Sequence, residues 1–223
     1  MPYRLGNLCG LAAPLLWASA IVICGELRPG FSHWSQYISE LGESGSKTEL
    51  LMRYAGFVPT GLMHIGFAAF LYAHFKNGRL TAAAASLLAL NGLARVTAGM
   101  FSCEAGCGGV GLEQQLHGLA ATTGFFAFIG AAVLWGIAFR RQSGLRNLSL
   151  YSFLSAILAL VFLLLMSWSD PTRAGTGLYE RLSSGLLSLW LFVFAARLWS
   201  AEILQRTWSP VRASRSRNGT AKP

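Results

Sequence analysis

The chain has 223 residues, of which 53% are hydrophobic and 12% are charged, and its mean hydropathy is +0.47. In soluble domains about a quarter of the residues are charged, so this composition excludes an ordinary soluble protein and indicates an integral membrane protein. The formal net charge of +9 is explained by a membrane-topology signal, and we predict no nucleic-acid partner.

Six apolar segments are long enough to cross a bilayer, which takes about 20 helical residues. In chain order they are 6–26, 52–74, 80–101, 116–139, 148–168 and 178–203. Because the connections are short, we expect one all-α domain over residues 5–203, a six-transmembrane-helix bundle. Residues 207–223 are rich in Arg, Ser and Pro, which predicts a basic, disordered cytoplasmic tail.

Lys and Arg residues divide unequally between the two sides of the predicted bundle. Eleven lie on the side of the amino terminus, against Arg28, Lys47 and Arg173 in loops on the opposite side. Positive residues of short loops stay in the cytoplasm, so both termini are predicted to be cytoplasmic. Eight of the nine acidic residues fall on the opposite side. We expect a bacterial inner (plasma) membrane protein whose chemistry is extracytoplasmic.

Three arginines lie within the outer parts of predicted helices: Arg53, Arg95 and Arg181. An arginine at that depth costs a few kcal/mol unless it faces a partner or a wet cavity, so these side chains should point into the bundle. Asn91 lies one turn from Arg95, and His64 shares a helical stripe with Arg53.

Together with acidic and histidine residues near the outer helix ends, these arginines predict an outward-facing polar pocket. Its expected ligand-binding residues are Glu40, Arg53, His64, Asn91, Arg95, His117, Glu180 and Arg181. In one interpretation the arginines pair with Glu26, Glu40, Asp170 or Glu180 and hold the bundle together. In another, Arg53, Arg95 and Arg181 bind a phosphate or carboxylate, with His64 or His117 as proton acceptor. An ion or proton pathway is the third interpretation.

The loop after the first segment reads Tyr37-Ile38-Ser39-Glu40-Leu41-Gly42. Ser39 can cap a turn or short helix, and Gly42 permits the bend that follows. We expect this loop to lie over the mouth of the pocket, with Glu40 directed at one of the three arginines.

Two cysteines stand four residues apart in a glycine-rich loop that the topology places outside. Cys103 and Cys107 are expected to form a disulfide in an oxidising compartment. The alternative is a metal site built from both thiols and His117 with Glu104 or Glu113. We favour the disulfide and predict no metal and no cofactor.

Several of these motifs occur in one order along the chain. They are the Tyr37–Gly42 stretch, Pro59 with Gly61, Gly92 with Arg95, Phe101 before the Cys103–Cys107 loop, His117, and Glu180-Arg181. In this combination the chain resembles the prokaryotic membrane-protein family called domain of unknown function 998, over approximately 5–203. The resemblance implies six helices and no established activity.

The Ile38–Gly42 segment is also similar to the Ile-Ser-Asp-Thr-Gly stretch of the eukaryotic Frag1/DRAM/Sfk1 membrane proteins, some of which are linked to lipid remodelling. This chain has Glu-Leu where that pattern has Asp-Thr.

Our leading hypothesis for function is that the pocket binds an anionic lipid headgroup or a small anion. Membrane lipid is then the partner, and a homo-oligomer is possible. The second hypothesis is an extracytoplasmic-side membrane hydrolase or transferase in which Ser39, Ser184 or Ser188 works with His64 or His117 and a carboxylate. No motif in the sequence places such a nucleophile beside a base. The third is a small transporter or a purely structural membrane protein.

Overall fold

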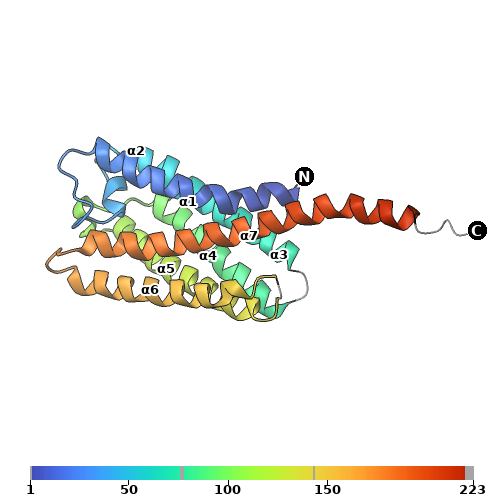
Figure 1. Cartoon of the computed structure of the whole chain (residues 1–223). Helices are drawn as coiled ribbons and strands as arrows, with labels where there is room; N and C mark the ends of the chain where they lie inside the picture. The colour runs from blue at the N-terminus through green and yellow to red at the C-terminus, as the bar shows by residue number, and fades with distance from the viewer. Residues whose placement is uncertain (1, 76–77, 143, 219–223) are drawn as a thin grey trace, which may run out of the picture.

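The computed structural model describes residues 2–75, 78–142 and 144–218, with side chains over 4–75, 78–142 and 144–200. Within this part of the chain, its long helices are α1 (Pro2–Leu27), α3 (Val58–His74), α4 (Arg79–Met100), α5 (Leu112–Phe139), α6 (Asn147–Ser169) and α7 (Thr176–Asn218) (Figure 1). Four short helices complete the description: η1 (Ser39–Gly42), α2 (Glu49–Leu51), the π-helix η2 (Met52–Phe57) and η3 (Ala105–Cys107).

Six of the helical spans are long and apolar enough to cross a membrane, which confirms the predicted fold class. The spans are Arg4–Leu27, Glu49–His74, Arg79–Met100, Leu112–Phe139, Asn147–Ser169 and Thr176–Ser200. Each contains a predicted segment almost entirely, because the apolar runs that a bilayer requires also fix where the helices lie.

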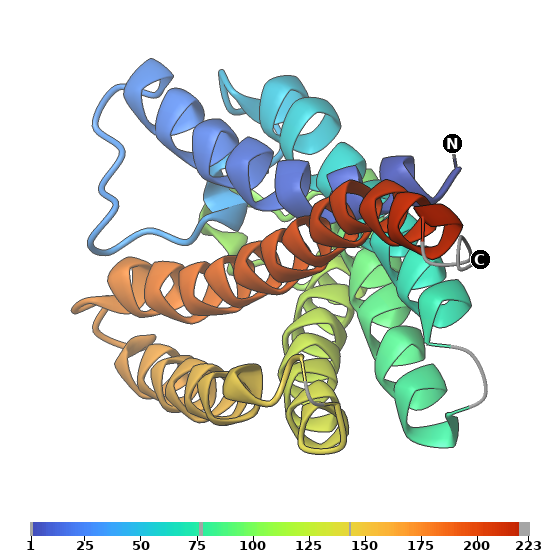
Figure 2. The ribbon, with the colours of Figure 1, turned by 45° about the vertical axis from the view of Figure 1, so that its right-hand side comes forward.

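The helices form a closed ring in sequence order. Each long helix packs against the next one along the chain, and α7 returns to pack against α1 (Figure 2). The loops 28–48, 101–111 and 170–175 gather at one end of the ring, here called the loop end (Figure 1). The amino terminus and the end of α7 lie at the opposite end, here called the terminal end (Figure 1). Which end faces the cytoplasm stays a prediction from the distribution of charge.

The second and last spans differ in detail from the predicted boundaries. The second begins at Glu49 and passes through the wide turn of η2 before reaching Pro59. Proline has no N–H to donate and clashes with the carbonyl four residues earlier, so a π-helix just before it relieves both problems. α7 continues to Asn218, so the backbone of 207–218 is helical where a disordered tail was expected. Residues 219–223 lie outside the described residues.

Helices α3 and α4 touch through glycines. A Cβ atom added to Gly61 would lie 2.6 Å from the carbonyl oxygen of Gly92, and one added to Gly92 would lie 2.6 Å from that of Gly61. No other residue fits such a crossing, and small residues are the usual means of close helix packing in lipid. This contact fixes the height at which the polar residues of α3 and α4 face each other.

Two apolar clusters divide the interior along the axis of the bundle. The larger one contains aromatic rings of α3, α5 and α7, among them Phe67, Trp135 and Phe194. The smaller one includes Trp17, Ile38, Leu41, Met52 and Phe57, from α1 and the loop-end segments. Buried polar residues lie between the two clusters, and they form the site described next.

The three loops of the loop end are joined to one another by polar contacts. Arg173 binds the Glu40 carboxylate at 3.0 Å and the Gly106 carbonyl at 2.7 Å. Glu43 binds Arg28 and accepts the N–H of Gly106 at 2.7 Å. These bonds tie η1 and the residues that follow it to the loops 101–111 and 170–175.

Candidate functional site

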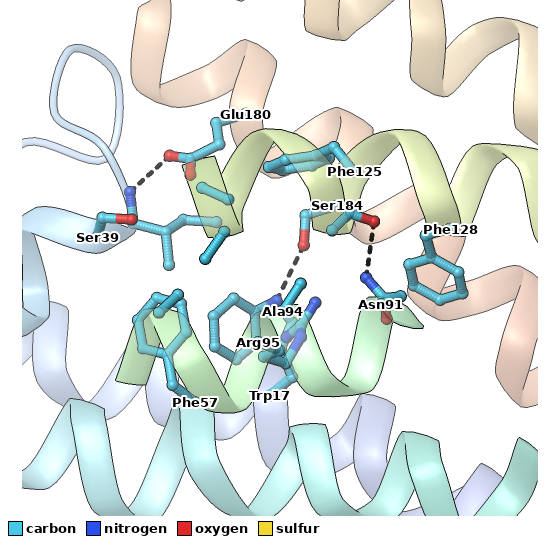
Figure 3. Close-up of a pocket in the computed structure, with 15 residues that line it drawn as sticks. Trp17, Ser39, Phe57, Asn91, Ala94, Arg95, Phe125, Phe128, Glu180 and Ser184 are labelled. Atoms are coloured by element: carbon cyan, nitrogen blue, oxygen red, sulfur yellow. Dashed lines mark hydrogen bonds between the residues drawn. The ribbon is translucent and has the colours of Figure 1, made fainter. Parts of the chain in front are cut away.

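A small cavity lies in the polar layer between the two apolar clusters. It encloses about 50 Å³, which is room for a few water molecules or for a group of a few heavy atoms. We call it the inner cavity (Figure 3). Its lining comes from α1, η1, η2, α4, α5 and α7 and includes Trp17, Ser39, Phe57, Asn91, Arg95, Phe125, Phe128, Glu180 and Ser184.

Arg95 of α4 lines this cavity and forms no ion pair with the side chains that the structure describes. Its guanidinium carbon lies 4.0 Å from the ring centroid of Trp17, and the Trp17 indole N–H donates to Ser184 Oγ at 2.9 Å. The Nη1 atom of Arg95 is buried and has no hydrogen-bond partner within the described residues. Stacking on an indole holds the guanidinium plane in position but leaves the N–H groups at its edge free to donate.

Asn91 is held one turn from Arg95 by bonds to two other helices. Its Oδ1 lies 2.6 Å from Nδ1 of His64, and its Nδ2 donates to the Gly124 carbonyl at 2.9 Å. Because an amide oxygen only accepts, the His64 Nδ1 carries the proton. Asn91 therefore lines the inner cavity with its hydrogen bonds already made, and His64 lies behind it against Phe128.

Glu180, in the first turns of α7, lies between the inner cavity and a second one. Its Oε2 accepts the backbone N–H of Ile38 at 2.6 Å, as the dashed line at the left of Figure 3 shows. The second cavity, which we call the outer cavity, holds about 250 Å³ and is lined by α5, α6, α7 and the loops. The residues that line both cavities are Ser39, Ala121, Phe125 and Glu180.

Both polar and apolar residues line the outer cavity. The polar ones include Tyr37, Ser39, Gln114, His117, Thr122, Ser167 and Glu180, and the apolar ones include Phe125, Phe126, Leu163, Leu164 and Met166. Phe126 and Leu164 are 53% and 58% exposed, so the cavity reaches the surface of the bundle between α5 and α6, where lipid chains would lie.

Ser39 and His117 are hydrogen-bonded to each other at the boundary of the two cavities. His117 Nε2 lies 2.9 Å from Ser39 Oγ, and its Nδ1 faces the carbonyl oxygens of Ala98 at 3.0 Å and Phe101 at 2.8 Å. Two acceptors at Nδ1 require the proton there, so Nε2 accepts from the Ser39 hydroxyl. The expected capping role of Ser39 is absent: the first turn of η1 has no side-chain cap.

Arg53 and Arg181 make their contacts outside the inner cavity, which Arg95 lines. Arg53 binds Glu49 at 2.6 Å and the carbonyls of Gly99 and Met100 at 2.9 and 2.7 Å. Neither arginine lines the inner or the outer cavity. For Arg53, the carboxylate of Glu49 one helical turn away balances the charge.

Arg181 turns toward the loop that follows α1. It donates to His33 Nδ1 at 3.0 Å and to the carbonyls of Gln36 and Gly177 at 2.8 and 2.7 Å. Its Nη2 atom is buried and has no partner within the described residues. Burial, and then the charge of Arg181, lower the pKa of His33 from its ordinary value, while Glu26 opposes them.

Among the described residues, Glu40 forms no ion pair with Arg53, Arg95 or Arg181. Its carboxylate binds Arg173, and it also accepts the backbone N–H of Tyr37 at 3.0 Å. The Tyr37 hydroxyl donates to Asp170. Burial and this contact with Asp170 raise the pKa of Tyr37 above its usual range. The rim of the site is thus closed by its own ion pairs.

Cys103 and Cys107 are joined by a disulfide, as the sequence predicted. The alternative metal site needs both thiolates, and the disulfide removes them. Glu104 accepts the backbone N–H of Gly111 at 2.9 Å, so it braces the same loop. Among the side chains that the structure describes, no three His, Cys, Asp or Glu residues lie together in a way that would hold a metal ion.

Comparison with known proteins gives one match. No match was found among curated proteins or among solved structures. The distant likeness to the Frag1/DRAM/Sfk1 proteins stays a prediction. The model of the family described as "Protein of unknown function (DUF998)" matches residues 11–197, a span that runs from α1 to α7 and includes the inner and outer cavities. The chain therefore belongs to the DUF998 family.

Proposed function

We propose that the inner cavity binds an anionic group, either the phosphate or carboxylate of a membrane lipid or a free small anion. The observation that carries this proposal is the buried Nη1 atom of Arg95, which has no partner among the described residues. A buried donor without an acceptor costs about 1–3 kcal/mol, and more when it is charged. An anion in the cavity removes that cost.

The surroundings of Arg95 support a ligand that carries both charges. Glu180 lines the same cavity, and among the described residues its carboxylate accepts only the bond from Ile38. A phosphate beside Arg95 would leave this carboxylate to face a cationic group. A zwitterionic phospholipid headgroup satisfies both charges, whereas inorganic phosphate satisfies one.

The test compares Arg95→Gln with Arg197→Gln, which removes an exposed arginine from the same bundle. Each protein is purified in mild detergent, and copurified phospholipid is measured by mass spectrometry. We expect Arg95→Gln to lose about tenfold or more of the lipid, because a charge-assisted hydrogen bond contributes about 1.5–3 kcal/mol. Arg197→Gln should retain it. Equal lipid in all three proteins contradicts lipid binding.

Calorimetric titration with inorganic phosphate separates the two sources of the anion. If the wild type binds free phosphate and Arg95→Gln does not, while neither carries lipid, the ligand is a small anion. If neither lipid nor phosphate depends on Arg95, the proposal fails.

A further inference from the structure

We propose that Ser39 and His117 are a nucleophile and its general base, and that the protein transfers or hydrolyses the acyl ester of a membrane phospholipid. The proposal rests on the proposed function, because the headgroup that binds in the inner cavity is what would bring an ester to Ser39. It names the reaction of that site and the class of substrate.

The first argument is the geometry of the pair. The Ser39 hydroxyl lies 2.9 Å from His117 Nε2, within the range at which a base removes a proton from a nucleophile. His117 is 4% exposed, and its Nδ1–H is held by two backbone carbonyls. In serine hydrolases a carboxylate holds the histidine in this tautomer; here the carbonyls of Ala98 and Phe101 do so.

The second argument is position. Ser39 lines both cavities, with Arg95 in the inner one and the apolar residues of α5 and α6 around the outer one. A phospholipid has its charged headgroup and its acyl chain on opposite sides of an ester. When the headgroup lies near Arg95 and the chain lies along Phe126 and Leu164, the ester carbonyl is placed at the boundary, where Ser39 is.

The third argument is that a structural role explains less. The Ser39–His117 bond does join η1 to α5, but η1 is already held by the Arg173–Glu40 ion pair and by the bond from Ile38 to Glu180. A hydroxyl bonded only to hold a loop would not need to line two cavities. Ser39 faces a histidine in the tautomer of a base, and it lines two cavities that a substrate could occupy.

The reaction balances as an ordinary acyl transfer. Ser39 Oγ adds to the ester carbonyl carbon while its proton moves to His117 Nε2. The bond from carbon to the glycerol oxygen then breaks, and the leaving lysophospholipid takes that proton. Water, or the hydroxyl of a second lipid, adds to the acyl-serine and gives its proton to His117. Release of the fatty acid or the new ester returns the proton to Ser39.

The test uses the full chain in nanodiscs of phosphatidylethanolamine and phosphatidylglycerol. It measures release of fatty acid and lysolipid, and it maps labelling by a fluorophosphonate probe with mass spectrometry. We expect the probe on Ser39 in the wild type. Ser39→Ala and His117→Gln should each lower both signals by about 100-fold or more. The matched control, Ser44→Ala, removes a hydroxyl of the same loop that bonds Ser102 and should leave both signals unchanged.

Arg95→Gln separates this proposal from the previous one. The probe has no headgroup, so labelling of Ser39 should persist in Arg95→Gln while phospholipid turnover falls. Conversely, Ser39→Ala should keep its copurified lipid. A wild type that is not labelled, or labelling that is equal in Ser39→Ala, overturns the catalytic role even if lipid binding stands. Melting curves of each variant show whether any loss comes from unfolding; if Ser39→Ala unfolds, His117→Gln decides.

Discussion

At the scale of single residues, Arg53, Arg95 and Arg181 have different environments although their sequence positions look alike. Arg53 and Arg181 have acceptors one turn away, Glu49 and the Gly177 carbonyl respectively. Arg95 stacks on the face of Trp17 and makes no hydrogen bond through Nη1 to any described residue. Helical spacing predicts which face of a helix a side chain occupies, and it says nothing about which neighbour takes its charge. That is why Arg95 and Asn91 could be placed toward the interior from the sequence, while the sequence could not say that Arg53 and Arg181 line neither cavity.

This difference predicts that neutralising Arg53 lowers stability and that neutralising Arg95 does not. Arg53→Gln breaks bonds to Glu49 and to the end of α4, so the free energy of unfolding should fall by about 1–3 kcal/mol. In delipidated protein, Arg95→Gln removes a charge without an ionic partner among the described residues and should not lower it. Chemical denaturation of both variants in detergent checks this. A larger loss in Arg95→Gln would mean that the residue holds the bundle together.

A second residue-scale prediction concerns pH. His33 accepts from Arg181 Nε, so it must be neutral, and its pKa is lowered in the folded chain by burial and by Arg181. When folding lowers the pKa of a histidine, its contribution to stability is fully present at pH values above the pKa of the unfolded state, about 6.5. This contribution is lost as the pH falls below that pKa. The wild type should therefore lose melting temperature between pH 7.5 and pH 5.

The control for this prediction is His33→Gln, whose amide oxygen can accept from Arg181 at either pH. The variant should show a smaller loss of melting temperature over the same range. An identical loss in both proteins would assign the pH dependence to other groups.

At the scale of elements, the apolar runs predict the spans well because a helix in lipid must satisfy its own backbone. The η2 turn was not predicted, since a π-helix has no sequence pattern of its own and only Pro59 marks its place. The Ser39–His117 pair was one of several serine–histidine combinations that the sequence offered, and the sequence could not select it. Its members are 78 residues apart, on a loop and on α5, and only the closing of the ring brings them together.

The crossing of α3 and α4 gives an element-scale prediction. Gly61→Ala places a Cβ against the Gly92 carbonyl and Val96, so the helices must separate. We expect the free energy of unfolding to fall by about 1–3 kcal/mol. Gly185→Ala is the control, because nothing lies within 4 Å of its added Cβ, and it should be neutral or slightly stabilising. Equal melting temperatures for the two variants would show that the crossing tolerates separation.

At the scale of the whole molecule, the loop end carries both the disulfide and the loops that cover the site. Disulfides persist in oxidising compartments, which supports the orientation predicted from charge. A green fluorescent protein fused after Pro223 should fluoresce in cells, and an alkaline phosphatase fused there should be inactive. Active phosphatase would reverse the orientation and place the site in the cytoplasm.

Removing the disulfide should loosen the rim without changing the bundle. The disulfide joins cysteines that are four positions apart in the sequence. For so short a loop, the chain-entropy relation gives a stabilisation of about 2 kcal/mol. Cys103→Ser with Cys107→Ser should therefore lower the free energy of unfolding by about that amount. Hydrogen exchange should rise in 101–111 and stay unchanged in α3. Protection that is the same in both proteins would show that the polar contacts of the loop end suffice.

The closing of the ring also bears on how the protein is made. Helices enter the membrane in the order of their synthesis, and α3 to α6 each find a neighbour already there. α1 must wait for α7, which is its second neighbour. Two hydrogen bonds join the first and last helices or their adjoining loops: one links Trp17 to Ser184, and the other links Ile38 to Glu180. A nascent chain that stops before α7 lacks Glu180 and Ser184, so the lining of the inner cavity is complete only after α7 has entered the bundle.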